Sequence, residues 1–140
     1  MLTKNSSILV RDVMLTDSEI PVVQKKTILK EALEKMGCTG LGIICIINEE
    51  KKLLGILTDG DLRRKLLKVQ KPLSAFFVDD ALDHAIFSPL IIKPNDTLIQ
   101  AVEVMKHKRI WDLPVVDGNG VLVGLLHLHP AVQALLEFNS

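Results

Sequence analysis

Hydrophobic and polar positions follow one another in an order that occurs twice along this chain. From Ile20 the sequence reads IPVVQKKTILKEALEKM, GLGIICII and LLGILTDGDLRRKLL, and from Ile91 it reads IIKPNDTLIQAVEVM, IWDLPVVDGNG and VLVGLLHLHPAVQALL. Three residues of the first copy recur in the second at one constant offset: Ala32 as Ala101, Met36 as Met105, and Gly55 as Gly124. Such internal similarity predicts two structural repeats with one topology.

Each copy opens with a short extended segment and continues into an amphipathic helix. Thr27 and Thr97 precede the two helices and are good N-cap residues. Gln100 lies three residues after Thr97 and completes a capping-box pattern. In the second helix, apolar residues from Leu98 to Met105 recur at helical spacing, so one face is expected to be buried. The extended segments are Ile20–Val23 and Leu90–Lys93.

Two strands and a closing helix complete each copy. The DGNG sequence at Asp117–Gly120 lies between two apolar runs and predicts a hairpin turn, which Asn48–Lys52 provides in the first copy. Pro130 suits the first turn of the second closing helix. The strands expected are Leu41–Ile47, Leu53–Leu57, Leu113–Val116 and Val121–Leu126, and the closing helices are Asp61–Leu67 and Pro130–Glu137.

The predicted fold class is therefore α/β (α+β), with two β-α-β-β-α repeats packed as a pseudo-twofold pair. A half of roughly 60 residues buries too little surface to be stable by itself, so we expect two related halves that pack together and share a cleft. We divide the chain into a linker with a short N-terminal helix (1–15), repeat 1 (16–68), a connector (69–89) and repeat 2 (90–140). Within the connector, Ala81–Phe87 is expected to be a short helix, the counterpart of Ile8–Met14.

Composition and charge narrow the function classes. The formal net charge is zero, with 48% hydrophobic and 24% charged residues, so the concentrated basic face needed for nucleic acid or a membrane surface is not expected. The apolar run Ile43–Ile47 is too short to cross a bilayer, and the N-terminus lacks the continuous apolar stretch of a secretory signal. Cys38 and Cys45 lack metal-type spacing and indicate reduced thiols, which predicts a cytoplasmic protein.

The order of elements, with GILTDGDL closing the first half, closely resembles the CBS domain pair over roughly residues 8 to 137. More narrowly, DVM, IPVV, TDGDLRR and HLH together resemble the C-terminal region of the arabinose-5-phosphate isomerases of the sugar-isomerase (SIS) family. This resemblance implies a role in carbohydrate metabolism, with the isomerase chemistry carried by an N-terminal SIS domain absent from this chain. No catalytic residue is carried over.

The stretch from Thr58 to Asp61 is the main candidate for a binding site. A strand ends near Thr58 and a helix starts near Asp61, so free backbone N–H groups and the Thr58 hydroxyl are expected to attract phosphate. Asp61 suits two adjacent ribose hydroxyls as an acceptor, and the resemblance implies this use of a Thr-x-x-Asp pair. Gly60 keeps the turn open to a ligand. The alternative is that Asp59 and Asp61 simply cap a helix while Thr58 satisfies the turn.

The second half departs from this pattern. It carries His127 and Pro130 at the positions of Thr58 and Asp61, so a second equivalent site is not expected, although His127 offers an imidazole to a phosphate or a sugar hydroxyl. If both His127 and His129 lay on a strand, they would share a face. No third ligand has matching spacing, so we predict strand-end histidines beside a ligand and no metal site.

The rest of the cleft is expected to be lined by the opening strands and the first strand of each hairpin. Trp111 can stack on a base, which is worth about 1–3 kcal/mol, or it can serve as a hydrophobic plug or dimer contact. Arg63 and Arg64 can meet phosphates or belong to a solvated helix face. The lining candidates are Ile20, Val22, Ile91 and Lys93 from the opening strands, and Gly42, Ile43, Trp111 and Leu113 from the hairpins.

Two functions follow from these features. The first is a regulatory module that senses a nucleotide or nucleotide-sugar in the inter-repeat cleft, with no cofactor required and with AMP, ATP or a CMP-linked sugar acid as candidate ligands. The second is a ligand-free dimerisation module, which the change to His127 and Pro130 favours. Both predict a homodimer through CBS pairs, with an SIS domain as a further partner in a full-length chain. An independent enzyme is not expected, because no nucleophile elbow, phosphate-binding loop or dinucleotide fingerprint is present.

Overall fold

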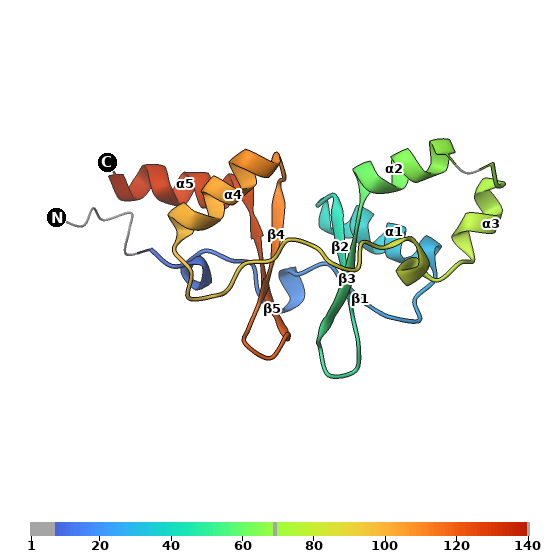
Figure 1. Cartoon of the computed structure of the whole chain (residues 1–140), viewed down its shortest axis with the longest axis horizontal. Coiled ribbons are helices and arrows are strands. Elements are labelled where there is room, and N and C mark those ends of the chain that lie inside the picture. The colour runs from blue at the N-terminus through green and yellow to red at the C-terminus, as the bar shows by residue number, and fades with distance from the viewer. Residues whose placement is uncertain (1–7, 69, 140) are drawn as a thin grey trace. The chain divides into compact units, whose positions relative to one another are not determined.

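The computed structural model describes residues 8–68 and 70–139 and contains two units of mixed helices and strands (Figure 1). One unit is Glu19–Pro89, called unit 2 below. The other, unit 1, combines Leu90–Ser140 with the segment that ends at Ser18. The α+β fold class predicted from the sequence is confirmed.

Unit 2 contains the first copy of the repeat and the segment that follows it. Its three-stranded sheet has the order β1-β2-β3, with β1 parallel to β2 and β2 antiparallel to β3. The short helices α3 and η4 come after the repeat, and Phe76 and Ala81 from them are buried in the same core as Leu29 of α1. The elements are β1 (Val22–Gln24), α1 (Leu29–Thr39), β2 (Ile43–Ile47), β3 (Leu53–Thr58), α2 (Asp59–Lys68), α3 (Leu73–Phe77) and η4 (Ala81–His84).

Unit 1 repeats this plan around the antiparallel pair β4-β5. An isolated parallel bridge from Ile92 to Val115 takes the place of an opening strand. The N-terminal segment belongs to this unit, because Ile8 and Val10 are buried in one core cluster with Leu98 of α4. The elements are η2 (Val10–Asp12), α4 (Leu98–Lys108), β4 (Asp112–Val116), β5 (Leu122–His127) and α5 (Leu128–Asn139), and η3 (Asp17–Glu19) spans the point where the chain passes from unit 1 to unit 2.

Each sheet receives a backbone segment from outside its own repeat. In unit 2, Ile86 pairs with Ile56 of β3, and in unit 1, Leu15 pairs with Leu125 of β5. These contacts are close, since a Cβ built on Gly55 would lie 2.8 Å from the carbonyl oxygen of Ile86. Described residues of the predicted linker and connector, such as Val10, Leu15, Phe76 and Ile86, therefore complete the sheets and cores of the two units.

Several local expectations hold, and others are corrected. The capping box of Thr97 and Gln100 at the start of α4 is confirmed. Thr27 does not cap α1, because the N-cap residue is Ile28 and no side chain bonds to the helix start. The expected helix over Ala81–Phe87 is a shorter 3-10 helix that ends at His84, and Ile8–Met14 contains only a three-residue 3-10 turn.

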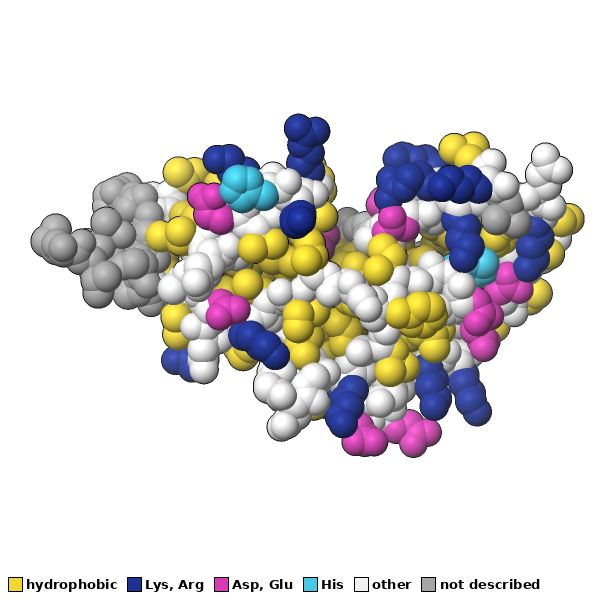
Figure 2. All heavy atoms as spheres, viewed as in Figure 1, with side chains coloured by type: hydrophobic (Ala, Val, Ile, Leu, Met, Phe, Trp, Pro, Cys, Tyr) yellow, Lys and Arg dark blue, Asp and Glu magenta, His cyan; other side chains and the backbone are white. Residues whose placement is uncertain are grey.

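The closing helices begin earlier than predicted, at Asp59 and Leu128. Pro130 lies in the first turn of α5, as expected. His129 lies on the helix and not on the strand, because β5 ends at His127. Figure 2 shows basic, acidic and hydrophobic side chains mixed over the face in view, with no single charged stripe across it.

Candidate functional site

The corner at which β3 passes into α2 is held by a reciprocal pair of hydrogen bonds. The backbone N–H of Asp61 donates to Oγ1 of Thr58 at 3.1 Å, and the Thr58 hydroxyl donates to Oδ2 of Asp61 at 2.7 Å. Thr58 precedes the helix and Asp61 is its third residue, so the pair acts as a cap that satisfies one of the open amides of the first turn. Thr58 and Asp61 therefore have a local structural role, as the alternative interpretation expected, but the capping side chain is Thr58 and not Asp61.

The surroundings of Asp61 and Asp59 correct one part of the prediction. The Asp59 N–H donates to the carbonyl of Gly42 at 3.1 Å, so this amide and that of Asp61 are already paired and are not free to hold phosphate. The guanidinium of Arg64 forms an ion pair with Oδ1 of Asp61 and also lies over Gly60. The Asp61 carboxylate can nevertheless accept further hydrogen bonds, because a carboxylate accepts about four and 30% of this side chain is exposed.

The equivalent corner of unit 1 has a different chemistry. The Leu128 N–H donates to the carbonyl of Trp111 at 2.8 Å, in the same way that Asp59 bonds to Gly42. Pro130 has no N–H to be capped, so a hydroxyl before the helix is not needed there. His127 instead contacts Oδ1 of Asp112 through Nδ1 at 2.8 Å. Asp112 faces His127 across the hairpin, in the register that pairs Ile43 with Thr58 in unit 2.

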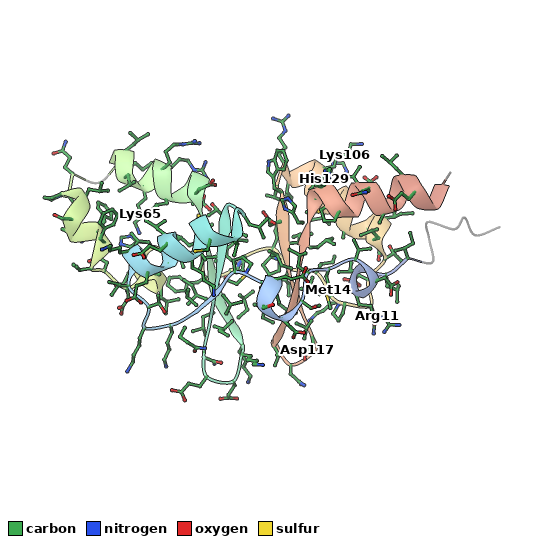
Figure 3. The ribbon with its side chains drawn as sticks, turned by 180° about the vertical axis from the view of Figure 1, so that it is seen from behind. Arg11, Met14, Lys65, Lys106, Asp117 and His129 are labelled. Atoms are coloured by element: carbon green, nitrogen blue, oxygen red, sulfur yellow. The ribbon has the colours of Figure 1, made fainter. Side chains whose placement is uncertain are left out.

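His129 is separated from this pair by its position on α5 (Figure 3). The argument that His127 and His129 share one strand face is therefore wrong. Among the residues that the structure describes, no group of three or more histidine, cysteine or acidic side chains is placed to hold a metal ion.

The predicted lining residues fall into two groups by exposure. Ile20, Ile43 and Leu113 are 8%, 1% and 0% exposed, so their side chains are part of the hydrophobic interior. Trp111 and Ile91 are 67% and 39% exposed and remain accessible. Val22 and Gly42 are half-buried. Lys93 donates from Nζ to the carbonyl of Asp117 at 3.1 Å, which ties it to the β4–β5 turn.

Two residues of these corners were not predicted from the sequence. Asp112 lay just outside the predicted strand Leu113–Val116 and had no predicted role, and Arg64 was predicted to meet phosphate or to belong to a solvated helix face. The pairing of Asp112 with His127 could have been found from the repeat offset, because both residues depart from the first copy at cross-strand positions, where Ile43 and Thr58 stand. Arg64 lies three residues after Asp61, a spacing at which opposite charges on a helix meet.

A third polar cluster fixes the segment after α2. Lys71 Nζ contacts Oδ2 of Asp79 at 2.7 Å, and Nε2 of His84 contacts the same oxygen at 2.9 Å. The hydrogen bond from Lys71 lowers the pKa of the Asp79 carboxyl below its usual value, and the bond to His84 lowers this pKa further. The cluster packs on the buried ring of Phe76, since Lys71 Nζ lies 5.2 Å from the ring centroid. The cluster connects the residues before α3 with the end of η4 through Asp79. It has no predicted role in ligand binding.

Comparison with protein families gives a match to the CBS domain over residues 10–68 and 82–129. Among curated relatives, an uncharacterised protein of Chlamydia trachomatis is 32% identical over 128 residues, which are 89% of this chain and 38% of the relative. The arabinose 5-phosphate isomerase KdsD of Salmonella typhi is 31% identical over 125 residues, which are 89% of this chain and 37% of that protein. The chain thus spans less than two fifths of the length of these relatives.

Solved structures give the same picture of the fold. A crystal structure of CBSX2 in complex with AMP has a TM-score of 0.82 and 27% identity, and the match covers 96% of this chain and all of that one (100%). A CBS domain-containing protein of unknown function from Bacillus anthracis has a TM-score of 0.83 at 18% identity, with 96% of each chain covered. Within the described residues, no helix has both the length and the apolar character to cross a membrane.

Proposed function

We propose that this chain, which belongs to the CBS domain family and carries two copies of the domain, binds a nucleotide at the β3–α2 corner and regulates a partner domain through it. A CBS pair is a regulatory ligand-binding module and not a catalytic one. The observation that carries the proposal is the Thr58–Asp61 pair at the start of α2, where a partly exposed carboxylate is held in place by a hydroxyl and a guanidinium.

The geometry supports a ligand with two adjacent hydroxyl groups. Thr58 and Arg64 occupy one position on each oxygen of Asp61, and the remaining lone pairs can accept the two hydroxyls of a ribose. Hydrogen bonds to a charged acceptor are the stronger kind, at about 1.5–3 kcal/mol each. The similarity to CBSX2, which was solved with AMP, supports an adenine nucleotide as the first ligand to test.

The similarity to arabinose 5-phosphate isomerases supports a proposal about the partner domain that the chain regulates. The chain matches part of those enzymes at about one third identity, and we propose that it regulates a sugar-phosphate isomerase through an SIS catalytic domain. A CMP-linked sugar acid is then the alternative ligand, as an end product that such a pathway would feed back. A ligand changes the partner only through its different affinity for two arrangements of the protein. The shared groove, the homodimer and the cytoplasmic location stay predictions.

Calorimetric titration tests the ligand and its place together. The chain is titrated with AMP, ATP, CMP and a CMP-linked sugar acid, and the best ligand is repeated on Asp61→Asn. Loss of a charged acceptor is expected to raise Kd about tenfold or more. Glu34→Gln is the matched control, because it removes a carboxylate from the exposed face of α1 in the same unit.

The same titration separates the sensory function from an assembly function. Wild-type binding that Asp61→Asn weakens and Glu34→Gln leaves unchanged supports the proposal. If none of the four ligands binds at millimolar concentration, the ligand-free assembly module takes its place. That second function is favoured by unit 1, where Pro130 and the His127–Asp112 pair replace the hydroxyl and carboxylate of unit 2.

A further inference from the structure

The turn between β4 and β5 contains the one Asn-Gly pair of the sequence, Asn119–Gly120. Asn119 is exposed, and its carboxamide forms no hydrogen bond with the other residues that the structure describes. A Cβ built on Gly120 would have nothing within 4 Å of it. The side-chain carbon of the asparagine and the peptide nitrogen of the glycine are therefore both uncrowded.

An asparagine that precedes a glycine loses its side-chain amide more readily than other asparagines. The peptide nitrogen of the glycine attacks Cγ of the asparagine, so that a new N–Cγ bond closes a succinimide ring and the Cγ–Nδ2 bond breaks. The amide group takes the proton of the attacking N–H and leaves as ammonia. A water molecule then opens the ring at either carbonyl and gives aspartate or isoaspartate. Glycine favours this attack, because it has no Cβ beside its nitrogen and is conformationally free.

We propose that Asn119 is a site of spontaneous deamidation and that Asp117, at the tip of the β4–β5 hairpin (Figure 3), controls its rate. The Gly120 N–H donates to the carbonyl of Asp117 at 3.1 Å. Oδ1 of Asp117 accepts from the N–H groups of Asn119 and Val121, at 2.8 and 3.0 Å. Because these bonds hold the attacking nitrogen, the turn has to open before Gly120 reacts. Local opening of an exposed turn costs less free energy than global unfolding.

Two other asparagines of the described chain lack this combination of features. Asn48, in the β2–β3 turn, precedes a glutamate, and its Oδ1 accepts from the backbone N–H groups of Glu50 at 2.9 Å and Lys52 at 3.0 Å. Asn95 precedes an aspartate, and its Oδ1 accepts from Nη1 of Arg11 at 2.8 Å. Both carboxamides are held in place and lie before residues with a Cβ, so they are expected to react more slowly and serve as internal standards.

The reaction changes the chemistry of this turn, independently of the nucleotide site. Either product replaces a neutral amide by a carboxylate, in a chain whose formal net charge is zero. Lys93 donates from Nζ to the Asp117 carbonyl at 3.1 Å, so the new negative charge arises in a turn that already holds a cation. Isoaspartate also adds a methylene to the main chain between Asp117 and Val121, which is incompatible with the hydrogen bond that now joins these two residues.

Peptide mapping by mass spectrometry measures the reaction at each asparagine. The whole chain is incubated in mildly alkaline buffer and digested, and the peptides with Asn119, Asn48 and Asn95 are scored for replacement of the amide NH₂ by OH. Isoaspartate is detected with an isoaspartyl methyltransferase. The Asn119 peptide is expected to convert several-fold faster than the other two. Asn119→Gln is the blank, because its longer side chain does not close the same ring. The site is overturned if Asn119 converts no faster than Asn48 or Asn95.

Two comparisons test the control by Asp117. Asp117→Ala removes both hydrogen bonds to Oδ1 and is expected to speed the conversion of Asn119 several-fold. Asn48→Ala is the matched control, because it removes the same pair of bonds from the β2–β3 turn, and it is expected to leave the Asn119 rate unchanged. The wild-type chain unfolded in urea is expected to convert faster than the folded chain. A wild-type rate in Asp117→Ala, or equal rates in folded and unfolded protein, would overturn this control.

Discussion

At the scale of single residues, the two strand-to-helix corners differ in whether the first turn of the helix needs a side-chain acceptor. In unit 2, the Asp61 N–H requires an acceptor, and Thr58 provides it. In unit 1, proline at position 130 removes that requirement, so His127 is free to turn to Asp112. The two corners therefore follow the same backbone path but carry different side chains. Unit 2 has a carboxylate on the helix, and unit 1 has an imidazole before the helix.

The Asp79 cluster makes stability depend on pH in the acid range. In the folded state, the hydrogen bond from Lys71 lowers the pKa of the Asp79 carboxyl below its ordinary value of 3.8. The hydrogen bond with His84 is the second cause of this lowering. A carboxyl with a depressed folded pKa contributes stability at pH values above its unfolded pKa, and this contribution is lost as the pH falls through the folded pKa. We expect Asp79→Asn to be less stable than wild type at neutral pH and to lose less stability between pH 5 and pH 2.

Urea unfolding at a series of pH values measures this dependence. Asp83→Asn is a suitable control, because Asp83 is an exposed residue of η4, next to His84, and only its backbone carbonyl forms a contact with Lys65, at 3.3 Å. Equal acid slopes for wild type and Asp79→Asn would show that the cluster does not form in solution.

At this scale the sequence allowed the candidate site to be predicted only in part. The Thr58–Asp61 pair was found, because a local i to i+3 motif is written in consecutive residues. The contacts of Arg64 and Asp112 were not, since they depend on side-chain rotamers and on which residue faces which across the hairpin. The paired state of the Asp59 amide depends on the carbonyl of Gly42, 17 residues away in the sequence.

At the scale of elements, each sheet is completed by a segment that lies outside its own repeat. Gly55 and Gly124 hold the same position in the two copies, and both face such a segment. A Cβ on Gly124 would collide with Sδ of Met14 and would lie 3.0 Å from the carbonyl oxygen of Leu15. Figure 3 shows Met14 beside the β4–β5 hairpin. The glycines therefore allow a backbone to approach a strand closely.

Gly55→Ala and Gly124→Ala are expected to destabilise the protein. The added methyl group meets backbone in both cases, so the segment has to shift, which costs about 1–3 kcal/mol. Gly37→Ala is the matched control, because Gly37 lies in α1 with nothing within 4 Å of its Cβ position. Alanine is the better helix former by roughly 0.5–1 kcal/mol. Urea midpoints that fall for Gly37→Ala, or that stay unchanged for the other two variants, would contradict this account.

The elements themselves were predicted well and their ends less so. The repeated order of elements located α1, α4 and all four hairpin strands, and hydrophobic spacing predicted the buried face of α4, because burial of one face determines the period. The starts of α1, α2 and α5 were each placed incorrectly, by up to two residues. The start of a closing helix also depends on backbone hydrogen bonds to residues distant in the sequence, such as that from Leu128 to Trp111, and these bonds cannot be recognised from the residues around the helix start. Residues 8–15 were assigned to a linker with a short helix, because their pairing partners lie about 80–110 residues further along the chain.

At the scale of the whole molecule, duplication gave two units that share a plan and differ at the corner where a strand passes into the closing helix. Similarity to other CBS proteins covers nearly all of this chain, whereas the chain covers at most two fifths of the curated relatives with which it was compared. The fold could be predicted from the sequence, because a repeat of about 69 residues shows most elements in two copies that can be compared. The identity of a ligand could not be predicted from the sequence, because a binding site depends on the placement of a few polar atoms.

A two-dimensional NMR titration of the chain labelled with ¹⁵N, with AMP as the ligand, tests the central claim most directly, because it reports both binding and its place. The account predicts that the amide signals of Thr58 to Leu62 shift in a saturable way in the wild type and that these shifts are lost in Asp61→Asn. The corner at His127 and Leu128 is expected to respond less. Saturable shifts confined to other residues, or unchanged spectra at millimolar AMP, would contradict the assignment of this corner as the nucleotide site.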